Sequence, residues 1–213
     1  MPLMKPTACV ALLGDLVASR EAPDRSALHR HLLQAIRSAN AGPQILDPLR
    51  VTAGDEFQGV FASVGAALAA TFTLRAALHP AQARFGLGIG SVQIIDAETN
   101  VQDGSAWWAA RSAIEAVEEA AHGAHRALRT GVAAAEGHEP PTASLRAAVA
   151  LTDAALFGLD DQDVVILAGL RAGTSQAMMA TRLQISPSAV SQRIARGRLA
   201  ILAEAMTHLE EVA

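Results

Sequence analysis

Two Gly-Asp pairs are the first residues whose types and setting indicate chemistry. Asp15 follows Gly14 at the end of an apolar run, and Asp55 follows Gly54 inside "RVTAGDEFQGVF", residues 50–61. If the two carboxylates meet at one sheet edge, they suit Mg²⁺, which keeps coordination positions for substrate phosphates. The glycines would let phosphates approach the backbone. The alternative is that each pair only supplies turn chemistry.

A second candidate region is set apart by its charge. Residues 164–203 contain no Asp or Glu, and they contain Arg171, Arg182, Arg193, Arg196 and Arg198, although the whole chain has a net charge of −4. The rest of the chain is correspondingly acidic. This asymmetry indicates that the C-terminal part meets an anionic partner.

The same region has the pattern of two short helices joined by a turn. A first helix ends at Gly173, Thr174 or Ser175 caps a second, "SQAMMATRL", and the turn "QIS" follows. Ser186 then caps a helix that opens at Pro187. This spacing is typical of the helix-turn-helix motif, whose second helix enters the major groove. The predicted buried face consists of Ala180, Ile185, Val190 and Ile194.

Side chains outside this buried face are of types that contact DNA. Gln pairs with adenine, Arg reads guanine or binds phosphate, and Ser binds phosphate. The predicted contacts are Ser175, Gln176, Ser186, Ser188, Ser191, Gln192, Arg193 and Arg196, with Arg193 on the presented surface. The stretch also resembles region-4-like modules of bacterial transcription factors. So small a module predicts a homodimer on double-stranded DNA; an ordinary helical hairpin with solvated arginines is the alternative.

The elements before residue 138 predict an α+β core in the order βαββαβ, with helices on one face of a mainly antiparallel sheet. The expected strands are residues 7–13, which open into a loop at Gly14, a hairpin turning at Gly54 and Asp55, "ARFGLGIGSVQIID", and a short one in "HRALRTGV". The alternating glycines of the third indicate a bulge or a close neighbour. The expected helices are "DRSALHRHLLQAIRSAN", "VGAALAATFTLRAALH" and "GSAWWAARSAIEAVEEAA".

The chain is predicted to have two domains. The stretch 133–144, with Gly and a Pro pair, reads as a linker, which gives domains 1–138 and 139–213, the second all-helical. No run of 18 apolar residues lacks a charge, and no signal peptide is recognised, so we expect a cytoplasmic protein without a membrane span. The single cysteine, Cys9, is expected to be a buried, inert thiol.

Four short blocks carry a resemblance to a known superfamily. In order and spacing, "LLGDLVAS", "TAGDEFQGVF", "RFGLGIGSV" and "GSAWWAARSAIEA" resemble class III nucleotidyl cyclases and GGDEF diguanylate cyclases. With the C-terminal helix-turn-helix, the chain resembles the bacterial SatD family. The resemblance implies a cyclase-like sandwich in which Asp15 and Asp55 hold metal over a nucleotide, with Gly14, Gly54, Glu56, Trp107 and Arg111 as the nucleotide-binding set.

Two departures from the superfamily pattern concern ribose and base recognition. Trp107 stands where a class III cyclase usually has Asn, and Val51 stands where it usually has a base-reading Lys. Arg111 is kept and would meet a phosphate. Of Trp107 and Trp108, one is expected to pack in the core and the other to stack on a base.

Three functions follow as hypotheses. The first is a DNA-binding transcriptional regulator whose cyclase-like domain senses a nucleotide or cyclic dinucleotide. The second is an active Mg²⁺-dependent nucleotide cyclase or nucleotidyltransferase tethered to DNA. The third is a catalytically dead interaction protein. The substitutions at Trp107 and Val51 favour the first over the second.

Overall fold

A five-stranded sheet lies at the centre of the structure, a computed structural model that describes residues 8–96 and 98–213. Within these residues the chain also forms eight α-helices, so the mixed α+β class is confirmed. The strands are β1 (Cys9–Leu16), β2 (Ile45–Ala53), β3 (Glu56–Phe61), β4 (Ala83–Gly90) and β7 (Thr130–Ala134), with a separate pair, β5 (Gln93–Asp96) and β6 (Val101–Asp103). The helices before residue 138 are α1 (Arg25–Ala39), α2 (Val64–Leu78) and α3 (Ser105–Ala121).

The sheet is mainly antiparallel, as predicted. Its strand order is β2-β3-β1-β4-β7, and β7 runs parallel to β4 while the other neighbours are antiparallel. The predicted hairpin is present: Ala53 pairs with Glu56, and Gly54 and Asp55 form the two-residue turn. Gly54 has φ of 62°, a conformation that glycine adopts without steric cost.

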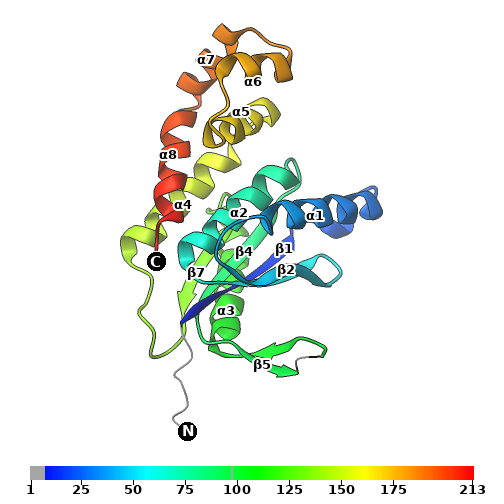
Figure 1. Ribbon diagram of the computed structural model, residues 1–213, viewed down its shortest axis with the longest axis vertical. Helices are drawn as coiled ribbons and strands as arrows, with labels where there is room; N and C mark the ends of the chain where they lie inside the picture. Colours follow the sequence, from blue (N-terminus) through cyan, green and yellow to red (C-terminus); the bar gives the residue numbers. More distant parts are fainter. Residues whose placement is uncertain (1–7, 97) are drawn as a thin grey trace.

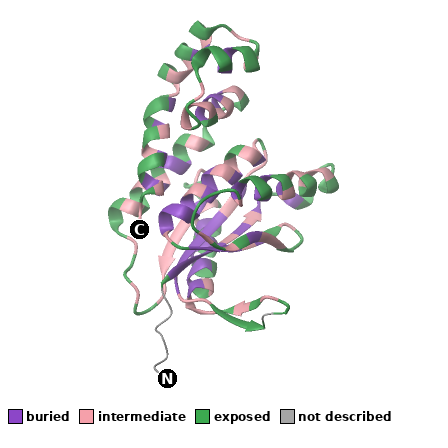
Figure 2. Ribbon diagram, in the orientation of Figure 1, coloured by how far each residue is buried: buried purple, intermediate pink, exposed green. Residues whose placement is uncertain are grey.

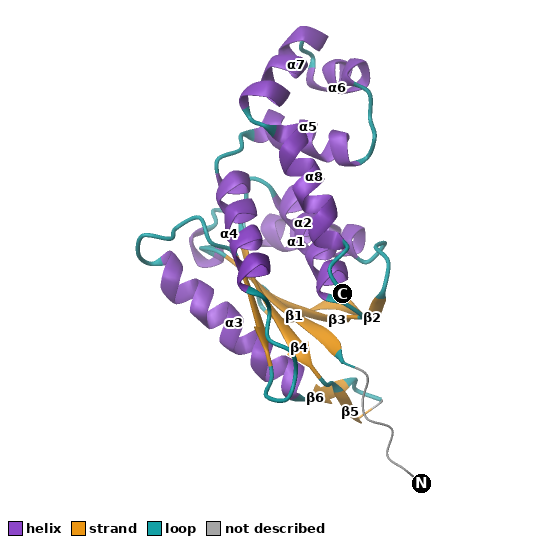
Figure 3. Cartoon of the chain, turned by 90° about the vertical axis from the view of Figure 1, so that its left-hand side faces the viewer, coloured by secondary structure: helices purple, strands orange, loops and turns teal. Residues whose placement is uncertain are grey.

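The expectation that the helices cover one face of the sheet is wrong. Helices α1 and α2 lie on one face, and α3 lies on the other (Figures 1 and 3). Alternation along β1 explains this, because successive side chains point to opposite faces. Leu12 and Leu16 pack in the large core with α1 and α2, whereas Cys9 and Ala11 pack with Ala106 of α3.

The glycines of β4 lie where α3 packs directly against the backbone of that strand, so that no side chain fits between them. A Cβ on Gly88 would stand 2.1 Å from the carbonyl oxygen of Ala106, and one on Gly86 would stand 2.2 Å from that of Ala110. The prediction of a close neighbour is therefore confirmed. In the same layer, burial raises the pKa of the Cys9 thiol, which agrees with an inert side chain.

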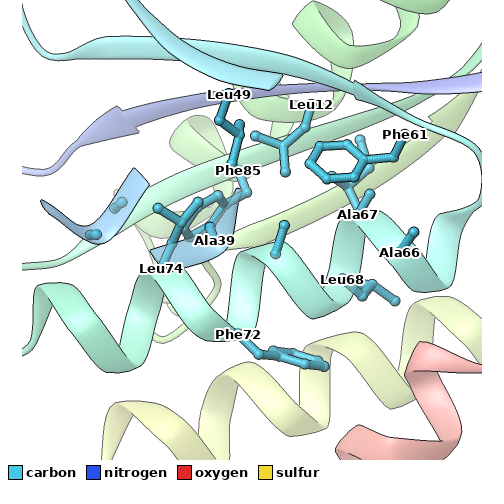
Figure 4. Close-up of a cluster of buried hydrophobic side chains, with 14 of the residues drawn as sticks. Leu12, Ala39, Leu49, Phe61, Ala66, Ala67, Leu68, Phe72, Leu74 and Phe85 are labelled. Carbon is cyan, nitrogen blue, oxygen red and sulfur yellow. The ribbon is translucent and has the colours of Figure 1, made fainter. Parts of the chain in front are cut away.

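Helix α2 is apolar around most of its circumference because it is covered over most of its surface. One side meets the sheet, where Phe61 and Phe85 are fully buried (Figure 4). The opposite side carries Phe72 toward the C-terminal helices, where Val149 and Met206 belong to the same hydrophobic cluster. The core therefore continues from the sheet into the C-terminal part.

Two strands differ from their predicted bounds. Strand β1 does not open into a loop at Gly14 but runs to Leu16, so that Asp15 pairs with Arg84 of β4. Residue 7, the predicted start, lies outside the described residues. The strand expected over "ARFGLGIGSVQIID" ends at Gly90, and its last residues turn away to form the β5–β6 hairpin.

The segment after residue 138 is helical, as predicted. It forms α4 (Ala143–Phe157), α5 (Asp161–Arg171), α6 (Gln176–Leu183), α7 (Pro187–Arg196) and α8 (Leu199–Glu210). Helices α4 and α8 reach the sheet part, and α6 and α7 form the far end of the molecule (Figures 1 and 2). Among the helices in residues 8–96 and 98–213, not one has both the length and the apolarity to cross a bilayer.

The boundary predicted near residue 138 lies in the loop between β7 and α4. Packing does not stop there, because α4 and α8 share the core of the sheet part. A second, smaller cluster holds α5, α6, α7 and α8 together and consists of Ile166, Met179, Ala180, Val190 and Leu199. The division into two domains stays a prediction.

Candidate functional site

The carboxylate of Asp15 is held by an arginine. Its two oxygens accept hydrogen bonds from Nε and Nη2 of Arg84, each at 2.9 Å. Arg84 also donates from Nη1 to Oε1 of Glu118 on α3, at 2.5 Å. Burial lowers the pKa of Arg84, but the two acids raise it, and the net pKa lies above its usual value. Arg84 therefore neutralises Asp15 on the α3 side of the sheet.

Asp55 lies in the turn between β2 and β3. It lines a hollow of about 440 Å³ together with Arg25, His29 and Arg30 of α1. Asp15 and Asp55 thus have different neighbours, and their convergence on a shared metal stays a prediction. Because β1 runs on through Asp15, alternation along the strand places Asp15 on the same face as Cys9 and Ala11, toward α3.

Glu56 and Arg111 are the two predicted nucleotide-binding residues that the structure does bring together. Oε2 of Glu56 lies 3.9 Å from Nη2 of Arg111, on α3. Each side chain is about half exposed, so solvent screens this pair and it contributes little to stability. Glu56 thus lies on the α3 side of the sheet.

The other predicted nucleotide-binding residues have packing or turn roles. A Cβ on Gly14 would lie 2.2 Å from Cζ of Phe57, so Gly14 makes room for that ring and not for a phosphate. Gly54 is open at the turn. Trp107 packs against the small hydrophobic cluster that α3 forms with β1, which includes Ala11 and Ala106, whereas Trp108 is 72 % exposed. Trp108, and not Trp107, is therefore the tryptophan free to stack.

A resident Mg²⁺ ion at this edge stays a prediction. Asp15 is engaged by Arg84, so a metal there would compete with the guanidinium, and Asp55 lines a hollow whose walls include residues of α1. In the part of the chain that the structure describes, no three His, Cys, Asp or Glu side chains lie close enough together to hold a metal.

A second surface is formed by α6 and α7, which are joined by the three residues 184–186. The predicted caps are confirmed: the Ser175 hydroxyl accepts from the Met178 N–H, and that of Ser186 accepts from the Ala189 N–H, ahead of Pro187. The predicted buried face is also confirmed. Ala180 and Val190 are buried, and Ile185 and Ile194 pack against them.

The predicted DNA-contact residues lie on the outside, with one exception. The exposed ones are Ser175, Gln176, Ser186, Ser188, Ser191, Gln192 and Arg196. Four of them form the exposed polar face of α7, which we call the α7 face: Ser188, Ser191, Gln192 and Arg196. These positions follow helical spacing, so their side chains leave the helix on neighbouring sides.

Arg193 is the exception, and its predicted place on the presented surface is wrong. Its Nη1 donates to Oδ2 of Asp160 at 2.8 Å and to Oδ1 of Asp163 at 2.7 Å, at the start of α5. The side chain points inward because position 193 follows Val190 by three residues, on the buried side of α7. Arg193 therefore links α7 to α5.

We expect Arg193→Gln to destabilise the protein by about 2 kcal/mol, since Asp163 is nearly buried and would lose its charged partner. Hydrogen bonds from Arg193 and the Asp163 N–H lower the pKa of Asp160 from its ordinary 3.8. The resulting stabilisation is therefore present above pH 3.8 and is lost as pH falls below it.

Urea unfolding between pH 2.5 and 7 measures this effect. The variant should lose part of the acid dependence of the wild type, and Arg182→Gln, at an exposed position of α6, should not change it. Equal unfolding free energies for Arg193→Gln and the wild type at pH 7 would show that the ion pairs contribute nothing.

Comparison with known protein families gives a match over nearly the whole chain. Residues 9–208 match the SatD family. The chain belongs to the SatD family. No curated protein matches it. A crystal structure of a regulator of polyketide synthase expression from Bifidobacterium adolescentis aligns over 98 % of this chain and 87 % of its own, at 16 % identity and a TM-score of 0.26. That likeness is too low to support an argument.

One important residue of this SatD-family protein was not predicted. Asp153 of α4 is 1 % exposed, and its carboxylate accepts from the Arg75 guanidinium and from the backbone N–H groups of Arg129 and Thr130, at 2.8 and 2.7 Å. It thereby joins α4 to α2 and β7. The available signal was a single acid inside the apolar stretch "AVALTDAALF", since a buried charge needs partners.

Proposed function

We propose that this SatD-family protein is a DNA-binding transcriptional regulator, in which α6 and α7 form a helix-turn-helix and α7 enters the major groove. The observation that carries the proposal is the two-sided character of α7. Its inner side packs in the small cluster through Val190, while the α7 face is fully available at one end of the molecule (Figure 2).

The chemistry of the α7 face suits a duplex. An amide such as that of Gln192 can pair with the N6 and N7 atoms of adenine, and a guanidinium such as that of Arg196 binds phosphate or guanine. The capped N-termini of α6 and α7 add serine hydroxyls and the positive ends of two helix dipoles near phosphates. Arg193 is left out of this set because it belongs to the ion pair with α5.

We further propose that the regulator works as a homodimer, because one module of this size covers few base pairs. A dimer with twofold symmetry would place two copies of α7 about one helical turn apart, roughly 34 Å. Light scattering at micromolar concentration checks the assembly, and a mass equal to one chain would contradict it.

Nucleotide sensing and turnover at the sheet edge stay predictions outside this proposal. The Arg84 pair weighs against them, because a metal at Asp15 would have to compete with that guanidinium. Thermal unfolding with Mg²⁺ and a nucleotide panel tests them directly, because a ligand that binds the folded state raises its stability.

The regulator proposal is tested by selection from random duplex oligonucleotides with the full-length protein. We expect one enriched motif with two related half-sites and an affinity that falls steeply with salt. The control is the same selection at high salt, in which non-specific retention disappears first. If no motif is enriched and no duplex is retained at low salt, the interaction-protein hypothesis replaces the regulator.

A further inference from the structure

A hollow of about 510 Å³ lies where the sheet part meets the C-terminal helices, and we call it the junction pocket. Its walls come from the second half of α2, the loop before β4, and helices α4, α5 and α8. Apolar side chains such as Phe72, Leu167 and Met206 form much of the wall. The volume is in the range of small-molecule sites, which are mostly apolar with a few polar groups.

The most unusual group in this wall is the guanidinium of Arg129. The residue is 8 % exposed, and the N–H groups of its guanidinium donate only to uncharged acceptors. Nε and Nη2 bond the side-chain oxygen of Gln82, and Nη1 bonds the carbonyl oxygens of Arg126 and Leu128, each at 2.7 Å. The ring of Phe157 lies 5.3 Å away from Cζ. Within the described residues, no carboxylate lies within salt-bridge distance of Arg129.

The neighbouring acid does not neutralise this charge. Asp153 pairs with the guanidinium of Arg75 and meets Arg129 only through the backbone N–H. Arg171, also in the wall, pairs with Glu210. The junction pocket therefore has one positive charge in excess, because Arg75 and Arg171 have partners and Arg129 has none among the described residues.

The surroundings of Arg129 make this charge costly in the empty protein. Burial lowers the pKa of Arg129, and the nearby charge of Arg75 lowers it further, against an opposing effect of Asp153. A guanidinium nevertheless stays protonated at neutral pH, so the protein keeps a poorly solvated cation. In addition, the Nε of Arg171 is buried with no hydrogen-bond partner in the described part of the chain.

We propose that the junction pocket binds a small organic carboxylate with an apolar body, whose carboxylate group neutralises Arg129. A single excess positive charge matches a monoanion, and it does not match the several charges of a nucleoside triphosphate. Arginine binds carboxylates through charge-assisted hydrogen bonds, and Nη2 of Arg129 has one N–H beyond its bond to Gln82. The apolar wall supplies the remaining affinity through burial of the ligand body.

The proposal does not depend on DNA binding. It has a structural consequence, because the ligand would touch α2 of the sheet part and α5, the helix to which Arg193 ties α7. Occupancy would stabilise this junction whether or not α7 binds DNA.

The test uses the full chain and two pairs of probes that differ in charge: octanoate with octanamide, and benzoate with benzamide. Calorimetry should show saturable binding of at least one carboxylate, at least tenfold tighter than its amide, together with a rise in the unfolding temperature. Absence of saturable binding by both carboxylates, or equal binding of acid and amide, would overturn the proposal.

Two variants locate the binding. Arg129→Gln removes the charge and should weaken carboxylate binding at least tenfold, and Ala168→Phe should do the same by filling the pocket without changing its charge. Arg20→Gln, an exposed arginine outside the pocket, is the matched control and should bind as the wild type does. If Arg129→Gln does not fold, Ala168→Phe and the comparison of each acid with its amide still test whether the junction pocket binds a carboxylate. Unchanged binding in the folded pocket variants would contradict the assignment.

Discussion

We expect Gln192→Glu to lower the affinity for the selected DNA site at least tenfold, with little change in the unfolding free energy. Gln192 is exposed on the α7 face, so its side chain has no packing role to lose. The substitution keeps the size of the side chain and places a negative charge where a helix in the major groove meets phosphates and base edges. Fluorescence anisotropy with a labelled duplex, at two salt concentrations, measures the loss.

The matched control is Gln34→Glu, the same change at an exposed position of α1 in the sheet part. It alters the net charge of the protein equally, so it corrects for long-range repulsion by the duplex. Equal affinities for Gln192→Glu and Gln34→Glu would show that α7 is not the recognition helix. Arg193→Gln further separates DNA contact from folding stability, because we expect this substitution to lower stability and to have little direct effect on DNA contact.

Asp153→Ala destabilises the protein by about 3–5 kcal/mol, the range for removing one partner of a buried ion pair. The substitution leaves the Arg75 guanidinium and the backbone N–H groups of Arg129 and Thr130 without their common acceptor. Since domains of this kind have about 5–15 kcal/mol of total stability, the loss is a large fraction of it. Urea unfolding followed by circular dichroism measures the change.

Two further variants grade this effect. Thr130→Val removes only the hydroxyl that donates to Asp153 at 3.1 Å, and it should cost about 1 kcal/mol. Glu119→Ala, at an exposed position of α3, should be within 0.5 kcal/mol or so of the wild type. A cost for Asp153→Ala no greater than that for Thr130→Val would mean that the buried carboxylate does not hold α4 against β7.

Features fixed by neighbours in the chain could be predicted from the sequence. The turn at Gly54 and Asp55, the caps at Ser175 and Ser186, and the buried residues of α6 and α7 depend on local hydrogen bonds and on helical periodicity. Each needs only a few consecutive residues to form, so residue types and spacing are sufficient to identify it.

The partner of each buried charge was decided only by the tertiary structure. Asp153 and Arg75 are 78 positions apart, and Asp163 and Arg193 are 30 apart, so no local pattern shows that they meet. Which face of the sheet α3 covers, and where the junction pocket opens, follow from the packing of whole elements against one another. A charged side chain in the sequence carries no sign of its distant partner, because the energy of pairing arises only when the fold removes both groups from water.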